Sequence, residues 1–98
     1  MIISKTPLRI SFFGGGTDYP EWFKSNRGAV LSTTIDKYSY IALNIKSSLF
    51  HKKYVITYRN VEKKNNISEI KHPSVRACLN YFKVPAGCEV IYNGDLPA

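Results

Sequence analysis

The stretch FFGGGTDYP, residues 12–20, holds the residues whose types and spacing could do chemistry. Its three consecutive glycines, residues 14–16, can adopt positive φ angles and let a ligand approach the backbone closely. Asp18 follows them and offers a carboxylate that accepts hydrogen bonds from sugar hydroxyl groups. Arg9 precedes them and offers a fixed fork of donors that suits a phosphate group. The pattern therefore indicates a site for a polyol, with an arginine available to stabilise negative charge.

The same stretch also has a purely structural interpretation. The glycines can form a tight irregular turn, and Asp18 can cap a short helix that includes Pro20 and Glu21. A helix starting there would place its partially positive N-terminus beside the glycines. Arg9 can equally be an exposed strand residue. The stretch is neither a Walker A motif, because no Lys-Ser or Lys-Thr pair follows, nor a GxGxxG fingerprint, so spacing alone leaves both interpretations open.

Residues 6–20, TPLRISFFGGGTDYP, resemble the first motif of the GHMP kinase superfamily, named for galactokinase, homoserine kinase, mevalonate kinase and phosphomevalonate kinase. The match continues through residues 28–36. The triple glycine is most similar to the D-glycero-D-manno-heptose 7-phosphate kinase branch. The resemblance implies an ATP-dependent sugar kinase that phosphorylates a heptose 7-phosphate, or a related sugar, at the anomeric hydroxyl. It also implies ATP and Mg²⁺ as cofactors.

The resemblance implies roles for individual residues. Asp18 matches the aspartate that binds sugar hydroxyls, and Arg9 matches the catalytic arginine near the transferring phosphate. Two of the glycines stand where galactokinases carry Glu and His, which argues against galactose and leaves room for a larger or phosphorylated sugar. The substrate-binding residues implied in this way are Gly14, Gly15, Gly16, Thr17, Asp18 and Tyr19.

The last residues, Leu96-Pro97-Ala98, resemble the lead-in to the family's Gly- and Ser-rich phosphate loop. The ligands of ATP and Mg²⁺ are therefore expected beyond Ala98, and no metal site is expected within the 98 residues. On this interpretation residues 1–98 are the truncated N-terminal part of a GHMP kinase N-terminal domain, without the phosphate loop and the C-terminal domain. We expect such a fragment to be inactive by itself.

The alternative function is a basic nucleic-acid-binding module. The expected layers resemble the ribosomal protein S5 domain 2-like fold, and the net charge is +7. No RNP-type motif accompanies these features, and the tyrosines alternate as strand residues do. The tyrosines that could stack on bases are Tyr38, Tyr40, Tyr54, Tyr58, Tyr81 and Tyr92.

Composition limits the remaining choices. A chain of 98 residues that is 44% hydrophobic suffices for one small domain. It contains no run of about 18 apolar residues and no signal peptide, so we expect a cytoplasmic protein without membrane partners. The 14 Lys and Arg against 7 Asp and Glu suit anionic partners, here a sugar phosphate and ATP. Homo-oligomer formation stays open.

Several other residues favour structural roles. The cysteines at positions 78 and 88 lack metal or disulfide spacing and are expected to be half-buried reduced thiols. His51 and His72 are too far apart for a shared metal, and Trp22 is expected in the core. The basic cluster is interpreted as a solvated strand face, with an anion-binding patch as the alternative. Its members are Lys52, Lys53, Arg59, Lys63, Lys64 and Lys71.

The pattern of apolar residues must place these groups on elements. Period-two alternation predicts strands over residues 2–13, 28–35, 38–46, 54–58 and 88–92. Turns are expected at residues 36–37 and 93–95, and a polar loop over residues 61–71. A second helix is predicted to start at His72-Pro73, with an apolar stripe of Val75, Cys78, Leu79 and Phe82. The predicted class is α+β, with a mainly antiparallel sheet covered on one face by helices.

Overall fold

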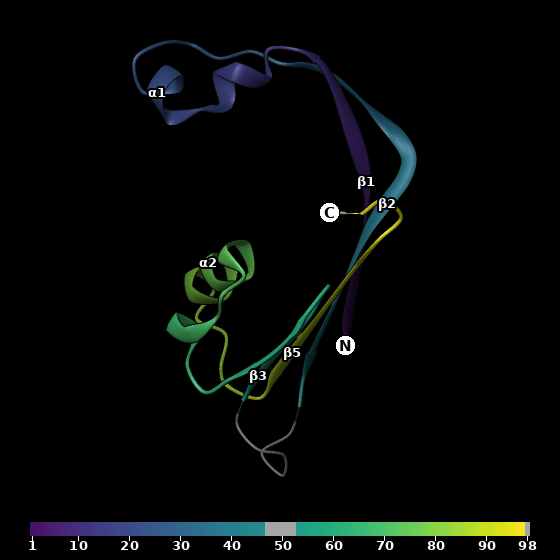
Figure 1. Ribbon diagram of the computed structural model, residues 1–98, viewed down its shortest axis with the longest axis vertical. Coiled ribbons are helices and arrows are strands. Elements are labelled where there is room, and N and C mark those ends of the chain that lie inside the picture. Colours follow the sequence, from purple (N-terminus) through teal and green to yellow (C-terminus); the bar gives the residue numbers. More distant parts are fainter. Residues whose placement is uncertain (47–52, 98) are drawn as a thin grey trace.

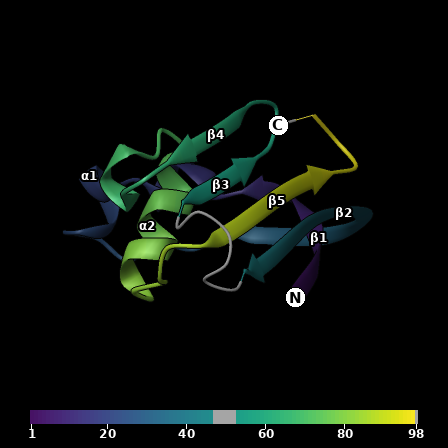
Figure 2. The same cartoon turned by 90° about the horizontal axis from the view of Figure 1, so that it is seen from below.

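The computed structural model describes residues 1–46 and 53–97, and its strands form one five-stranded sheet in the order β1-β2-β5-β3-β4 (Figure 2). The strands are β1 (Ile2–Phe13), β2 (Leu31–Ile45), β3 (Tyr54–Thr57), β4 (Val61–Lys64) and β5 (Cys88–Gly94). All neighbours pair antiparallel except β3 and β5, which run parallel. The predicted α+β class with a mainly antiparallel sheet is therefore confirmed.

The helical elements are short. They are the 3-10 helices η1 (Gly15–Asp18) and η2 (Ile67–Glu69) and the α-helices α1 (Pro20–Phe23) and α2 (Pro73–Tyr81). Both α-helices lie on the same side of the sheet (Figure 1). Within residues 1–46 and 53–97, no helix has the length and hydrophobicity needed to cross a bilayer.

Helix α2 starts where the sequence predicts. His72 is its N-cap, and the His72 Nδ1 accepts a hydrogen bond from the backbone N–H of Val75 at 3.4 Å. The expected apolar stripe is only half right. Val75 and Leu79 pack on the sheet, whereas Cys78 and Phe82 are exposed. The helix ends at Tyr81, so Phe82 follows it as the C-cap residue and no longer lies on the helix face that packs against the sheet.

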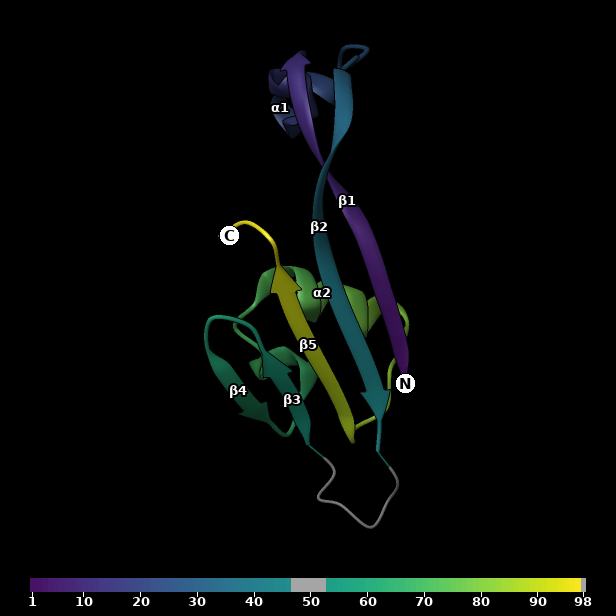
Figure 3. The ribbon, with the colours of Figure 1, turned by 90° about the vertical axis from the view of Figure 1, so that its right-hand side faces the viewer.

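The hydrophobic core lies entirely on the α2 side of the second half of the chain. Its buried apolar residues are Tyr54, Ile56, Ile70, Leu79, Cys88 and Val90. No residue among residues 1–46 is buried. The long β1–β2 hairpin instead projects past the ends of β5 and β3 (Figure 3). The radius of gyration is 16.4 Å, against about 13 Å for a compact domain of this size.

Strand β2 runs unbroken through residues where a turn was expected. Asp36 and Lys37 lie in its middle, so the prediction of two strands joined at residues 36–37 is wrong. The register explains the error. Pro7 pairs with Tyr38, and Arg9 pairs with Thr34, so a single β1 residue faces three residues of β2. Such an irregularity bends the hairpin without ending it. Pro7 is tolerated because β1 is an edge strand.

Residues 61–71 are more ordered than the predicted polar loop. They contain β4 and η2, and β4 pairs antiparallel with β3. The strand was missed because its inward position is occupied by Glu62, a charged residue where the alternating pattern would put an apolar one. Glu62 pairs with Ile56, and only 6% of its surface is exposed.

Three smaller expectations also fail. The turn expected at residues 93–95 is not formed, because residues 93 and 94 continue β5. Asp95 follows the strand, and its Oδ2 accepts a hydrogen bond from the Tyr38 N–H at 2.8 Å. Trp22 is 47% exposed rather than in the core, because α1 sits on the projecting hairpin. Both cysteines are free as predicted, but Cys88 is buried and Cys78 is exposed rather than both being half-buried.

The Glu62 carboxylate is satisfied by three donors. Its Oε1 accepts from the Lys71 N–H at 2.8 Å, and its Oε2 accepts from the His72 N–H at 3.2 Å and the Tyr58 hydroxyl at 3.3 Å. Burial alone would raise the pKa of Glu62. These hydrogen bonds outweigh the burial and hold the pKa below its ordinary value of 4.5, because they stabilise the charged form.

Glu62 should therefore make stability depend on pH. Because its pKa is lower in the folded than in the unfolded state, its stabilisation is complete above pH 4.5 and is lost as the pH falls through the folded-state pKa. We expect Glu62→Gln to lower the free energy of unfolding at neutral pH by about 1–3 kcal/mol and to flatten its decline in acid. Urea titrations at several pH values measure both effects. A variant with an unchanged acid decline would contradict this assignment.

Candidate functional site

The glycine stretch lies in the connection between β1 and β2, at the far end of the projecting hairpin (Figures 1 and 3). Gly14 precedes η1 with a φ of 88°, in the left-handed region. A Cβ at this position would overlap the carbonyl oxygen of Ala29. Both features restrict the position to glycine, so Gly14 sets the direction in which the chain leaves β1.

Thr17 holds the two sides of this connection together. Its hydroxyl donates to the Gly14 carbonyl at 2.7 Å and lies 3.2 Å from both the carbonyl oxygen and the N–H of Ala29. A Cβ on Gly28 would lie within 3.2 Å of Thr17, so this packing is tight. We expected Thr17 among the substrate-binding residues, but its hydroxyl is engaged in the loop itself.

Gly15 and Gly16 differ from Gly14. Nothing lies within 4 Å of a Cβ built on either residue, so neither glycine is needed to avoid a clash. The backbone of η1 is therefore open to a ligand on this side.

Arg9 and Asp18 come together at this open surface. The Arg9 Nη2 lies 3.8 Å from the Asp18 Oδ2, and each side chain is 58% exposed. An exposed pair at this distance is held weakly, since water screens it. Both groups are therefore accessible, and a ligand with hydroxyl and phosphate groups can contact one carboxylate and one guanidinium at the same place.

The structural alternative, in which Asp18 caps a short helix, is wrong. Asp18 is the last residue of η1 and makes no capping hydrogen bond, whereas Tyr19 is the N-cap residue of α1 and is exposed. Both η1 and α1 have four residues. Helices this short carry little dipole, so the anticipated contribution of a helix N-terminus to anion binding is small. The Asp18 carboxylate instead lies near the Arg9 guanidinium and stays exposed.

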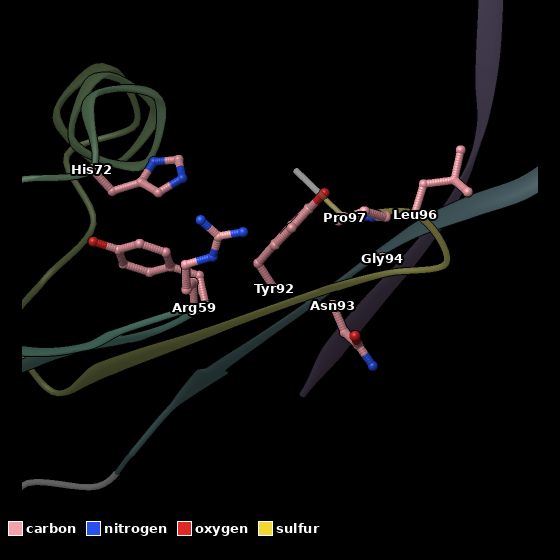
Figure 4. A pocket seen from close by; sticks show the side chains of 8 residues that line it. Arg59, His72, Tyr92, Asn93, Gly94, Leu96 and Pro97 are labelled. Carbon is pink, nitrogen blue, oxygen red and sulfur yellow. The ribbon is translucent and has the colours of Figure 1, made fainter.

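A second feature, an open cavity of about 570 Å³, lies between the β3–β4 turn, α2 and the end of β5. In Figure 4 the side chains of Arg59 and His72 point toward each other, whereas Tyr92 extends toward Pro97 and Asn93 points away. Leu96 and Pro97 also border the cavity. From the sequence Arg59 is only a member of the basic cluster, because the cavity joins segments far apart in the chain.

The tyrosines do not form one stacking surface. Tyr54 is buried, and its hydroxyl donates to the Val84 carbonyl at 2.9 Å. Register places Tyr92 opposite Ile41, on the α2 face, while Tyr40 lies opposite Asn93 on the other face. The tyrosines that could stack on bases are therefore divided between the two faces of the sheet.

In the part of the chain that the structure describes, no three His, Cys, Asp or Glu side chains gather as metal ligands do.

No protein-family model matches the sequence, and a comparison with curated proteins gives no match. Among solved structures, the fold is similar to a D-glycero-D-manno-heptose 1-phosphate kinase from Bacteriodes thetaiotaomicron, with a TM-score of 0.67 and 20% sequence identity. The similarity covers 98% of this chain and 34% of that kinase. This chain therefore shares its fold with part of that protein and spans about a third of that protein's length.

The three glycines should respond differently to substitution. Gly14→Ala should lower the free energy of unfolding by about 1–3 kcal/mol, because the left-handed φ and the Ala29 carbonyl both oppose a side chain. Gly16→Ala is the matched control and should leave stability within about 0.5 kcal/mol. Thermal and urea unfolding of both variants test this. Equal stability of the two variants would contradict the geometry assigned to Gly14.

Proposed function

We propose that this chain is the N-terminal, substrate-binding part of an ATP-dependent sugar kinase that acts on a heptose phosphate. The observation that carries the proposal is the meeting of Arg9 and Asp18 beside the open Gly15–Gly16 backbone. The similarity of fold to a heptose 1-phosphate kinase supports it. In its finer form, the proposal is that a heptose 7-phosphate receives the phosphoryl group at its anomeric hydroxyl.

In this proposal the sugar binds to the segment between β1 and β2 that contains Gly14, Gly15 and Gly16, which we call the glycine connection. Asp18 accepts hydrogen bonds from sugar hydroxyls and orients the ring. Arg9 lies within 3.8 Å of that carboxylate and stabilises negative charge near the reacting hydroxyl. The open backbone at Gly15 and Gly16 accommodates the bulk of the sugar, and the exposed Tyr19 borders it. Phosphoryl transfer depends mainly on such positioning and charge neutralisation.

The cavity beside β5 is the proposed site for part of ATP, which supplies the phosphoryl group. Arg59 faces this cavity, and it forms no ion pair with a carboxylate in residues 1–46 and 53–97. The His72 ring uses Nδ1 as an acceptor, so its neutral form carries the proton on Nε2 and can donate it to an anion. The cavity also borders Leu96 and Pro97, the pair that resembles the start of a phosphate loop.

The sugar site can be tested by binding. Asp18→Asn should weaken binding of D-glycero-D-manno-heptose 7-phosphate about tenfold, because the neutral amide accepts hydrogen bonds less strongly than the carboxylate. Glu21→Gln is the matched control, since Glu21 is also an exposed acid of this connection but makes no ion pair with Arg9. NMR titration of the labelled chain measures both affinities. Absence of sugar-phosphate binding by the unaltered chain, or equal losses in both variants, would reject the proposed sugar site.

A further inference from the structure

Glu62 connects two segments that form the wall of the cavity beside β5. One is the β3–β4 turn, from which Tyr58 donates its hydroxyl to the carboxylate. The other is the start of α2, from which Lys71 and His72 donate their backbone N–H groups. Tyr58 and His72 also line the cavity, whereas Glu62 does not. The buried carboxylate therefore contacts the cavity only through its neighbours.

The geometry between these neighbours is specific. The rings of Tyr58 and His72 meet edge to face, with centroids 4.9 Å apart and an interplanar angle of 81°. The Tyr58 N–H donates to the Asn60 carbonyl at 2.9 Å, and this closes the turn that carries Arg59. Holding Tyr58 thus holds the backbone of the turn from which the Arg59 side chain extends. Holding the His72 backbone limits where its imidazole can lie.

We infer that Glu62 is a positioning residue: its carboxylate fixes Tyr58 and His72 so that Arg59 and the His72 Nε2–H converge on the phosphate groups of a nucleotide. The inference rests on the proposed function, since the ligand is ATP in both. It adds a residue that is buried, that does not touch the ligand, and that determines the affinity of the cavity. A carboxylate suits this role because it has enough lone pairs to accept all three hydrogen bonds at once.

A solely structural role for Glu62 predicts something different. In that case its substitution lowers the melting temperature but leaves the affinity for MgATP unchanged at temperatures where the variant is folded. It also leaves the relative placement of the His72 and Arg59 side chains unchanged. Affinity and side-chain resonances, measured well below the unfolding transition, therefore separate the two roles.

The test compares Glu62→Gln with Glu69→Gln in the full chain. Glu69 is exposed and bonds only with Asn66 in the described residues, so Glu69→Gln makes the same chemical change away from the cavity. Tyr58→Phe provides a milder variant that keeps the ring and removes one hydrogen bond, should Glu62→Gln fold poorly. The readouts are the affinity for MgATP and the resonances of the His72 ring and the Arg59 Nε–H.

We expect Glu62→Gln to weaken MgATP binding about tenfold and Tyr58→Phe to weaken it about threefold, with Glu69→Gln unchanged. The His72 and Arg59 resonances should shift in the first two variants without ligand. Wild-type affinity in both Glu62→Gln and Tyr58→Phe would overturn the inference while leaving the ATP site in place. If the unaltered chain does not bind MgATP, the ATP site itself is rejected, and the positioning role fails with it.

Discussion

The pairing of β2 with two neighbours is the constraint on which the arrangement of both candidate sites depends. On one side β2 pairs with β1 and so carries the glycine connection, and on the other it pairs with β5, which borders the cavity. Leu43, opposite both Ile2 and Val90, packs against the core cluster of β3, β5 and α2. The β1–β2 hairpin has no buried residue of its own. The position of the glycine stretch relative to the core therefore depends on the backbone hydrogen bonds between β1, β2 and β5.

Two side chains with oxygen acceptors or donors, Thr17 and Glu62, define the local geometry at the two candidate sites. The Thr17 hydroxyl ties Gly14 to Ala29, and the Glu62 carboxylate ties the β3–β4 turn to the start of α2. Each joins segments that the sheet alone would leave independent. Neither group is spare for a ligand, because each is already satisfied within the protein. Preorganisation of this kind leaves Arg9 and Asp18, the groups proposed to face a ligand, outside both hydrogen-bond networks.

Sequence patterns predicted those parts of the structure that depend on neighbours along the chain. The extended run at residues 2–13, the start of α2 at His72-Pro73 and a tight turn that needs glycine at Gly14 are local properties, and the structure has all three. The continuity of β2 was not predictable in this way. Asp36 and Lys37 have turn-like composition, and only the register against β1 shows that a bulge accommodates them.

Strand β4 and the cavity also depend on residues far apart in the chain, so sequence patterns did not predict them. A strand with Glu62 facing inward breaks the alternating pattern, and only donors from residues 58, 71 and 72 make that position acceptable. Arg59, His72 and Tyr92 come from three separate elements, so no spacing in the sequence relates them. The Arg9–Asp18 pair was found because a resemblance to a known motif, rather than spacing, supplied the relation between the two residues.

The surplus of positive charge on the chain bears on both candidate sites. The chain carries 14 basic against 7 acidic residues, and the ion pairs formed within residues 1–46 and 53–97 are Arg9–Asp18 and Lys46–Glu89. Transfer of a phosphoryl group to a sugar phosphate brings two anionic reactants together, which repel each other. A protein with surplus positive charge lowers that repulsion and attracts both reactants from solution. Arg9 at the glycine connection and Arg59 at the cavity place such charge at the two positions where the proposed reactants bind.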